Sequence, residues 1–389
     1  MSFAPIRKMA NVSGVAGLFL RLGATAFGGP AAHIALMEHE AVIRRGWLSR
    51  EDFLDLLGVV NLIPGPNSTE LAIFLGYRRA GWMGLLLAGV CFILPAALIV
   101  GVIAWAYLKF GKLPEALGLL YGIKPVIIAV VLQAIWNLGR IAVKTRTLAI
   151  VGVGAAALSY LAINPLLVLL VAGLFMLALR AWSRPKGTVA CLTPLLGMTS
   201  AAPLAAAGAA APFSLLALFL FFLKVGAVLF GSGYVLLAFL RADLVEHWHW
   251  LTENQLLDAV SVGQFTPGPV FTTATFIGYI LGGPKAAFLA TVAIFLPSFV
   301  LVAISGPLVP RLRRSPLAGA FLDGVNVASL ALMAVVTWQL GRAALVDWLT
   351  VSLVVAAAVW LLCFRVNSTW LILGGAALGL ARSVFQAGP

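Results

Sequence analysis

Charged residues are scarce in this sequence of 389 residues: they make up 10% of it, whereas 62% of the residues are apolar. A soluble globular protein carries roughly 25% charged residues. The composition therefore excludes an ordinary soluble domain and favours a chain surrounded by lipid. The few charges are unbalanced, with a formal net charge of +13. Because the basic residues stand singly or in pairs between long apolar runs, they resemble membrane-topology signals, and we expect no nucleic-acid partner.

Cysteine and histidine are also rare. The three cysteines, Cys91, Cys191 and Cys363, lie far apart without a C-x-x-C motif, so neither a disulfide framework nor a zinc site is predicted. His247 and His249 lack a third ligand nearby, and we expect them in a polar loop. No Gly-x-x-x-x-Gly-Lys-Ser/Thr motif is present, which argues against an ATP-driven pump. The sequence also contains no cluster of acid, base and nucleophile residues, so it predicts neither an enzyme nor a cofactor or metal.

The N-terminus resembles a secretory signal, since Arg7 and Lys8 precede an apolar run and the small residues Ala24-Thr-Ala26. Arg21 interrupts that run, and the same segment recurs in mid-chain, where no signal peptidase acts. We therefore interpret the segment as a helix that is retained.

The chain contains an internal duplication. The segment 19–28 resembles 222–231, and over residues 19–66 sixteen of 48 positions are identical at an offset of 203 residues. Further on the offset becomes 202, where Trp136–Arg140 matches Trp338–Arg342. Such self-similarity indicates repeated structural units. We predict a first repeat at 1–182, a linker at 183–212 and a second repeat at 213–389.

The apolar runs are too long for barrel strands, so the predicted fold is an all-α polytopic membrane protein. The expected spans are 12–31, 53–77, 82–106, 114–138, 147–163, 165–181, 213–232, 255–280, 285–304, 317–340, 347–363 and 367–384. The loop with Lys109 and Lys112 is poor in basic residues, but its second-half equivalent contains Arg311, Arg313 and Arg314. This switch of the positive-inside bias predicts inverted repeats. Six crossings per half would require one more in the linker, thirteen in all.

Two cations recur at matching positions within apolar helices. Arg21 and Lys224 each lie about ten residues, or roughly 15 Å, into a predicted span. A charge at that depth is expensive and suggests function. The alternative, a side chain that snorkels to the interface, is difficult so far from either end. We predict that both cations bind the substrate. The matching acids Glu40 and Asp243 are expected in solvated or interfacial segments.

Two Pro-Gly-Pro segments interrupt apolar runs at matching positions. Proline removes a helix donor and glycine permits a sharp turn, so we predict broken helices whose second halves point free N–H groups inward. Such helix N-termini bind anions. The predicted substrate-binding residues at the two breaks are Asn61, Gly65, Asn67, Ser68, Thr69, Gln264, Thr266, Gly268, Thr272 and Thr273. The predicted structural residues are Gly28, Gly29, Pro64, Pro66, Gly231, Gly233, Pro267 and Pro269. A purely structural kink is the alternative.

Glu70 is the one acid beside the first break, and Thr273 replaces it in the second half. It could carry a coupling proton, or it could cap a helix N-terminus. Both readings stay open from the sequence. Asp55 and Asp258 also match and are expected near the broken helices.

At these motifs the chain resembles the chromate transporter family. The resemblance lies in Phe27-Gly-Gly-Pro30 with His33, in Asn61-x-x-Pro-Gly-Pro66, in Gly263-Gln-x-Thr-Pro-Gly-Pro269 and in Phe295-Leu-Pro297. It covers both halves and implies the long, two-domain form, in the cytoplasmic (inner) membrane of a bacterium or archaeon. It further implies chromate efflux driven by the proton motive force, with sulfate as a structural mimic.

The residues agree with the resemblance on the charge of the ligand, because two cations and two helix N-termini suit a dianion. The predicted partners are therefore chromate or sulfate and the lipid bilayer. A passive anion channel and a sulfate uptake carrier are the alternatives. The sequence leaves open the native substrate, the direction of transport, the coupling ion and whether the chain forms a homo-oligomer.

Overall fold

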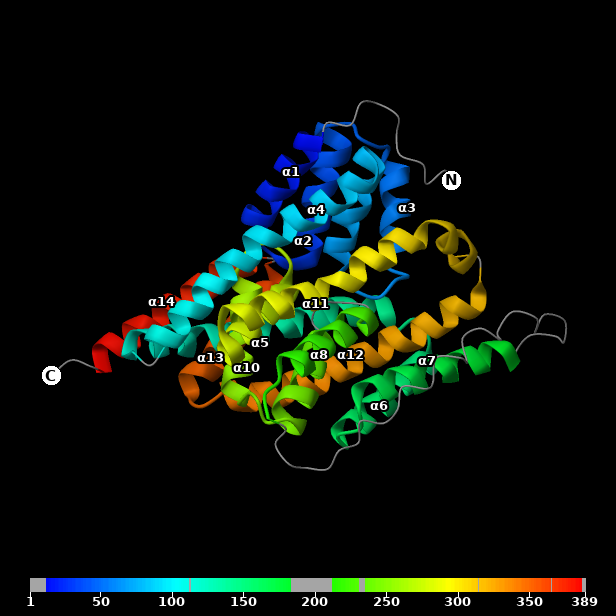
Figure 1. Cartoon of the computed structure of the whole chain (residues 1–389). Coiled ribbons are helices and arrows are strands. Elements are labelled where there is room, and N and C mark those ends of the chain that lie inside the picture. Colours follow the sequence, from blue (N-terminus) through cyan, green and yellow to red (C-terminus); the bar gives the residue numbers. More distant parts are fainter. Residues whose placement is uncertain are drawn as a thin grey trace.

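The computed structural model describes residues 12–111, 113–182, 212–230, 235–313, 315–364 and 366–386, and every regular element in these ranges is helical (Figure 1). The all-α prediction is confirmed. The first half contains α1 (Val12–Thr25), α2 (Gly29–Glu38), η1 (His39–Arg44), α3 (Arg50–Val60), α4 (Asn67–Phe110), α5 (Pro114–Ala142), α6 (Arg146–Tyr160) and α7 (Pro165–Trp182). The second contains α8 (Leu215–Val228), α9 (Leu236–Leu240), η4 (Arg241–His247), α10 (Glu253–Phe265), η5 (Val270–Thr272), α11 (Thr273–Arg313), α12 (Pro316–Ala344), α13 (Trp348–Cys363) and α14 (Ser368–Gln386).

The elements of the two halves follow one another in the same order. The helices α1 and α8 end at Thr25 and Val228, which are 203 residues apart, and α5 and α12 begin at Pro114 and Pro316, which are 202 apart. The structure therefore repeats the offsets found in the sequence, and the prediction of two homologous halves is confirmed. Except for Pro212, the predicted linker lies outside the described residues.

The longest helix of each half is folded back on itself. In α4 the reversal lies at Ala80 and Gly81, where Gly81 has φ 60°, and in α11 it lies at Gly282 and Gly283, where Gly283 has φ 70°. The arms pack backbone to backbone, since a Cβ added to Gly76 would overlap the Gly84 carbonyl oxygen. Each of these helices is thus a hairpin of two apolar arms. The reversal in α4 falls between the predicted spans 53–77 and 82–106.

Six segments of the described chain are long and apolar enough to cross a bilayer: Asn67–Phe110, Pro114–Ala142, Pro165–Trp182, Val270–Ser305, Pro316–Ala344 and Ser368–Phe385. Large apolar side chains such as Leu98, Val102 and Phe288 lie exposed on the second arms of α4 and α11, as contact with lipid requires. The protein is a multi-pass membrane protein. The total number of crossings stays a prediction.

The first helix is shorter than the predicted span 12–31. It ends at Thr25 because Gly28 and Gly29, with φ values of 101° and 74°, turn the chain into α2. At 1.5 Å per residue its 14 described residues extend about 21 Å. The side chain of His33 on α2 is buried, and its Nε2 lies 3.0 Å from the Ala26 carbonyl oxygen, which ties α2 to the end of α1.

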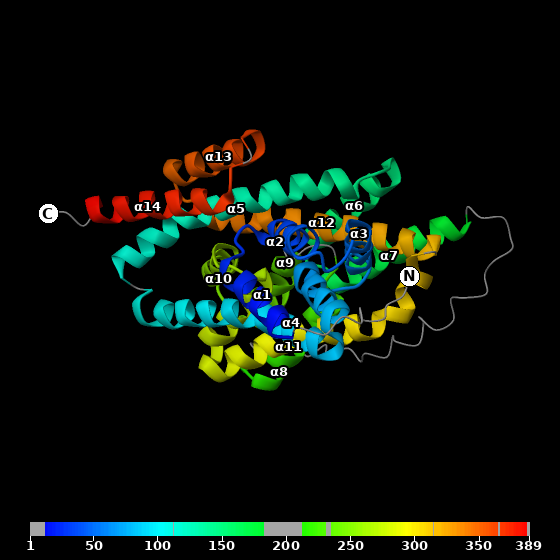
Figure 2. The same ribbon diagram turned by 90° about the horizontal axis from the view of Figure 1, so that it is seen from above.

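The two halves interlock through their central helices. The helix α5 packs along α14 and α13 of the second half, and α12 packs along α7 and α6 of the first (Figures 1 and 2). The α5–α14 contact is close because a Cβ on Gly122 would overlap the Gly375 carbonyl oxygen. Small residues that let helix backbones approach are typical of packing in membranes. Each half therefore completes the bundle of the other.

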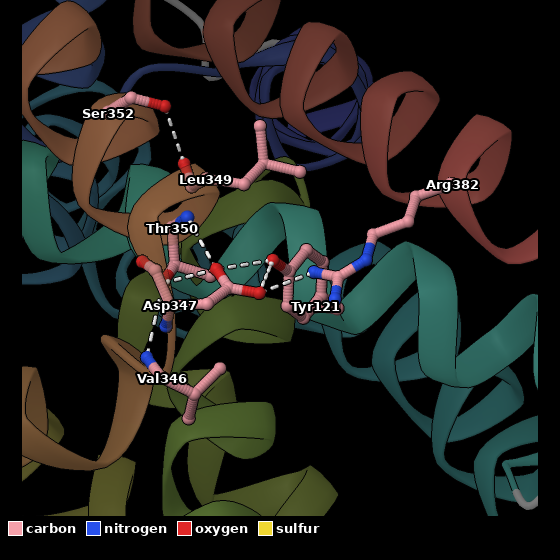
Figure 3. A network of polar contacts seen from close by, with 7 residues as sticks. All are labelled: Tyr121, Val346, Asp347, Leu349, Thr350, Ser352 and Arg382. Carbon is pink, nitrogen blue, oxygen red and sulfur yellow. Dashed lines mark hydrogen bonds and ion pairs between the residues drawn. The ribbon is translucent and has the colours of Figure 1, made fainter. Parts of the chain in front are cut away.

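A polar network fixes α5, α13 and α14 to one another (Figure 3). Asp347 caps α13 by accepting the Thr350 backbone N–H at 2.9 Å. The same carboxylate accepts the Tyr121 hydroxyl at 2.6 Å and an Arg382 guanidinium N–H at 2.7 Å. The Arg382 guanidinium also stacks on Tyr121, 4.2 Å from the ring centre. One carboxylate thus joins helices from both halves.

Candidate functional site

Each Pro-Gly-Pro segment lies between two helix ends. The helix α3 ends at Val60 and α4 begins at Asn67, while α10 ends at Phe265 and η5 begins at Val270. The prolines 64, 66, 267 and 269 lie within these gaps. The central glycines have φ values of 134° at Gly65 and 86° at Gly268, conformations that residues with a side chain rarely adopt. The chain therefore breaks at both segments.

Each break is hydrogen-bonded to the end of the first helix of the opposite half. The Gly65 N–H donates to the Leu229 carbonyl at 2.8 Å, and the Gly268 N–H donates to the Ala26 carbonyl at 2.9 Å. Leu229 and Ala26 are themselves equivalent, one at the end of α8 and the other just after α1. Each break is thus held by the first helix of the opposite half. A reciprocal pair of this kind indicates an approximate two-fold relation between the halves.

Glu70 is fully buried at the first break. Its exposed fraction is 0%, and neither carboxyl oxygen forms a hydrogen bond of ordinary geometry among the described residues. The Ser298 hydroxyl of α11 is beside it: a Cβ added to Gly65 would overlap Glu70 Oε1 and lie 2.9 Å from Ser298 Oγ. An ionised carboxylate buried without a partner is costly. A proton on Glu70 would remove that cost.

The second break has a different chemistry. Thr273 occupies the position of Glu70, and its hydroxyl donates to the Val270 carbonyl at 2.8 Å. The hydroxyls of Thr272 and Thr266 likewise donate to backbone carbonyls of their own segment, each at 2.8 Å. Ala96 faces Gly268 where Ser298 faces Gly65. The predicted hydroxyl donors of the second break are therefore buried and engaged with the backbone.

Arg21 forms an ion pair. Its guanidinium lies 2.5 Å from Glu40, and Arg44 and Arg45 contact the same carboxylate at 3.0 and 3.3 Å. The side chain of Glu40 is 8% exposed, so the carboxylate is buried, although its segment was expected to be solvated or interfacial. Burial alone raises the pKa of Glu40, but the hydrogen bonds from the three guanidinium groups outweigh it and lower the pKa to about 2. The carboxylate stays charged at physiological pH.

Lys224 has the equivalent partner in the second half. Its Nζ lies 2.5 Å from Asp243 Oδ2, and the two residues are 19 positions apart, as are Arg21 and Glu40. The matched spacing was visible in the sequence, but periodicity alone does not show that two segments fold together. Both predicted cations are therefore neutralised by a carboxylate of the segment that follows their helix, while nearly half of each side chain remains exposed.

Asn61 and Asn67 lie on either side of the first break and face each other. The Asn67 Nδ2 donates to Asn61 Oδ1 at 2.8 Å, and both residues line a cavity of about 400 Å³ against α12. Ser68 and Thr69 are buried in the first turn of α4. In the second half Gln264 lies partly buried at the end of α10, while Gly231 and Gly233 lie outside the described residues.

A second polar cluster, which the sequence did not reveal, surrounds Asp258 on α10. Lys124 Nζ lies 3.0 Å from Asp258 Oδ1, and the Tyr107 hydroxyl donates to Oδ2 at 2.8 Å. Lys124 also lies 3.4 Å from the Asn254 side-chain oxygen. Asp258 is nearly fully buried, and the cluster joins α4 and α5 to α10, the helix that ends at the second break. Sequence reasoning missed Lys124 and Tyr107 because they lie far from Asp258 along the chain.

Comparison with known proteins gives one family. The model of the chromate transporter family matches residues 14–177 and 216–380, that is, each half once. The chain is 33% identical over 367 residues to the chromate transport protein of Cupriavidus metallidurans. The aligned region covers 92% of this chain and 90% of that protein. It is 33% identical to a probable chromate transport protein of Synechococcus elongatus, with 93% of both chains covered. It is 31% identical to the chromate transport protein of Pseudomonas aeruginosa, with 87% and 84% covered. No solved structure matches the chain.

Proposed function

Because the chain belongs to the chromate transporter family, we propose that it carries chromate out of the cell across the bacterial cytoplasmic membrane, driven by the proton motive force. The family consists of membrane transporters, so the chain is a transporter and not an enzyme. The direction, the coupling ion and the membrane are parts of the proposal.

The observation that carries the proposal is the pair of reciprocal breaks. Broken helices at matching positions of two repeats are characteristic of the substrate sites of secondary transporters. The first turn of α4, which begins at Asn67, presents a positive dipole end at the first break. The hydrogen bonds of Gly65 and Gly268 couple the breaks to opposite halves. A movement of one half against the other therefore acts on both breaks, as alternating access requires.

Glu70 supplies a site for the coupling proton. It lies three residues beyond Asn67, so the substrate's helix N-terminus and the carboxyl group share one turn of α4. A charged carboxylate close to a dianion is repelled, whereas a protonated one is not. Binding of an oxyanion at the first break and ionisation of Glu70 therefore oppose each other, so a proton travels in the same direction as the oxyanion. In this scheme the inward pH gradient opposes efflux, and the membrane potential drives it, because a dianion with one proton still carries a negative charge.

Arg21 and Lys224 act mainly through their ion pairs in this proposal. Three guanidinium groups surround the single Glu40 carboxylate, so this cluster keeps an excess of positive charge that attracts an anion. The Arg21–Glu40 pair also holds the end of α1 in place. That end carries the Ala26 carbonyl to which Gly268 is bonded.

The proposal is tested in inside-out membrane vesicles from bacteria that produce the chain. A respiratory substrate should cause chromate to accumulate, and a proton ionophore should abolish the accumulation. Vesicles preloaded with unlabelled chromate should take up labelled chromate by counterflow, which a passive channel does not show. Net flux without counterflow would establish a channel. Sulfate accumulation in right-side-out vesicles, without chromate transport in inverted ones, would establish an uptake carrier.

Glu70→Gln tests the coupling. The variant should keep chromate counterflow, which needs no net proton movement, but its chromate accumulation should no longer depend on an imposed pH gradient. Thr273→Val, at the equivalent position of the second half, is the matched control, because the Thr273 hydroxyl only bonds to its own backbone. Chromate accumulation in Glu70→Gln that still responds to the pH gradient as in the wild type would refute the role of Glu70.

A further inference from the structure

A polar cavity of about 400 Å³ lies between the first Pro-Gly-Pro break and α12. Both halves of the chain contribute to it. Its polar lining residues are Asn61, Asn67, Lys144, Asp323, Asn326 and Ser329. The three α12 residues are spaced three apart, so they share one face of that helix. The remaining wall consists of apolar side chains.

One group in this wall points to an occupant. The side chain of Ser329 is buried, with an exposed fraction of 2%, and its Oγ has no hydrogen-bond partner among the described residues. Buried polar atoms are nearly always satisfied by protein, water or a ligand. Across the cavity, Asn67 is the first residue of α4, so the positive end of that helix faces the same space. An unsatisfied hydroxyl and a helix N-terminus together suit an oxyanion.

The cavity also contains an exchangeable cation. Lys144 Nζ lies 2.9 Å from Asp323 Oδ1, and the two side chains are 58% and 36% exposed. An ion pair this exposed contributes little to stability, so a dianion can replace Asp323 at Lys144 at small cost. The Arg21–Glu40 pair differs, because its carboxylate is buried and has three partners. Lys144 is thus the cation more easily released to a substrate.

The second half provides an internal comparison. At the same offsets, Val270 stands in place of Asn67, Val346 in place of Lys144 and Ile127 in place of Ser329. The helices of both halves form at equivalent positions in spite of these differences. These three polar residues are therefore not needed to build the fold. The other three positions stay polar in the equivalent set, where Gln264, Tyr121 and Lys124 correspond to Asn61, Asp323 and Asn326.

We propose that this cavity binds the tetrahedral oxyanion during transport, with Lys144 as its charge partner and Asp323 as the carboxylate that competes for Lys144. This inference rests on the proposed oxyanion transport and assigns its binding site to one break. Asp323 retakes Lys144 when the anion leaves, so the empty carrier does not hold an unpaired cation.

The test is equilibrium binding of labelled chromate and labelled sulfate to the purified full-length protein in detergent. Lys144→Gln should weaken binding about tenfold to a hundredfold, the loss expected for one charge-assisted hydrogen bond. Ser329→Ala should weaken it about twofold to tenfold. Asp323→Asn should tighten binding, because it removes the competitor. Lys285→Gln is the control, since Lys285 is exposed at the reversal of α11, outside the cavity.

The opposite signs at Lys144 and Asp323 distinguish a binding site from a structural ion pair. If the pair only holds α12 to the end of α5, both variants should lose folded protein and neither should change the dissociation constant. Unchanged dissociation constants in the folded fraction, or equally weakened anion binding in both variants, would overturn the proposal that this cavity is the binding site. Chromate counterflow by the wild type, measured in parallel, separates the two proposals. If the wild type shows counterflow but the variants keep the wild-type dissociation constant, the protein is a carrier and the proposed binding site is wrong. If the wild type shows no counterflow, the proposal that the protein is a carrier is wrong.

Discussion

Gly65→Ala and Gly268→Ala are a matched pair of perturbations. Both glycines have a positive φ, and each donates one hydrogen bond to the other half, at 2.8 and 2.9 Å. An alanine forced into a left-handed conformation costs about 1–2 kcal/mol. Loss of the hydrogen bond costs about 1 kcal/mol more. Both variants should therefore lower the free energy of unfolding by similar amounts, about 2–3 kcal/mol each.

The two variants differ in what the new methyl group meets. At Gly65 it would overlap Glu70 Oε1 and lie 2.9 Å from Ser298 Oγ, so the carboxyl group must move. At Gly268 it would lie 2.6 Å from Ala96 Cβ and 3.0 Å from the Gly23 carbonyl oxygen, where only packing is disturbed. Gly65→Ala should therefore impair proton coupling, whereas Gly268→Ala should impair stability alone.

The assay compares two chromate fluxes in the same reconstituted vesicles. One is accumulation under a pH gradient with an alkaline lumen, and the other is counterflow without a pH gradient. Their ratio is independent of the amount of folded protein. A shift of about 1.4 kcal/mol in the energy of the Glu70 site changes the ratio tenfold. We expect a drop of about that size in Gly65→Ala and a ratio within about twofold of wild type in Gly268→Ala. Equal ratios in the two variants would refute the reasoning, because the overlap with Glu70 would then have no consequence.

Two further predictions concern the ion pairs and the topology. Arg21→Ala should insert and fold, because Arg44 and Arg45 still contact Glu40, but it should lose most chromate flux because the end of α1 is released. Arg21→Lys should keep part of the flux. Normal flux in the alanine variant would contradict this role of Arg21. If the repeats are inverted, single cysteines at positions 79 and 281, introduced after the three native cysteines are replaced, should be labelled from opposite faces of the membrane. Labelling of both from one face would exclude inversion.

The backbone of this protein was largely predictable from the sequence, because local rules determine it. Apolar runs gave the helices, and glycine and proline marked their ends. The break between Val60 and Asn67 falls at the predicted Pro-Gly-Pro segment. The end of the first helix was predicted several residues too far along the chain, because whether Gly28 and Gly29 turn the chain depends on φ angles that a sequence does not display.

The contacts that build the site were less predictable, because they join residues far apart in the chain. Glu40 was noticed as a matched acid, yet nothing in the sequence indicates that its segment folds back on Arg21. Lys144 and Asp323 are 179 positions apart, and each looks like an ordinary loop or helix charge until α5 and α12 are placed side by side. Polar residues at helix ends near a break were the one available signal.

The difference between the two breaks has a consequence for turnover. A symmetric cradle would surround the dianion with two helix N-termini, each contributing up to about 2 kcal/mol in a partly buried setting, together with two cations. A carrier must also release its substrate, so binding that is too favourable slows transport. In the described structure the threonines of the second break are bonded to their own backbone, and Ala96 lies beside Gly268 where Ser298 lies beside Gly65. Duplication therefore supplies the two-fold framework, while divergence leaves an acid, Glu70, at the first break and a threonine, Thr273, at the second. On this reasoning, Thr273→Glu would not create a second coupling site, because Ala96 lies beside the second break where the Ser298 hydroxyl lies beside the first.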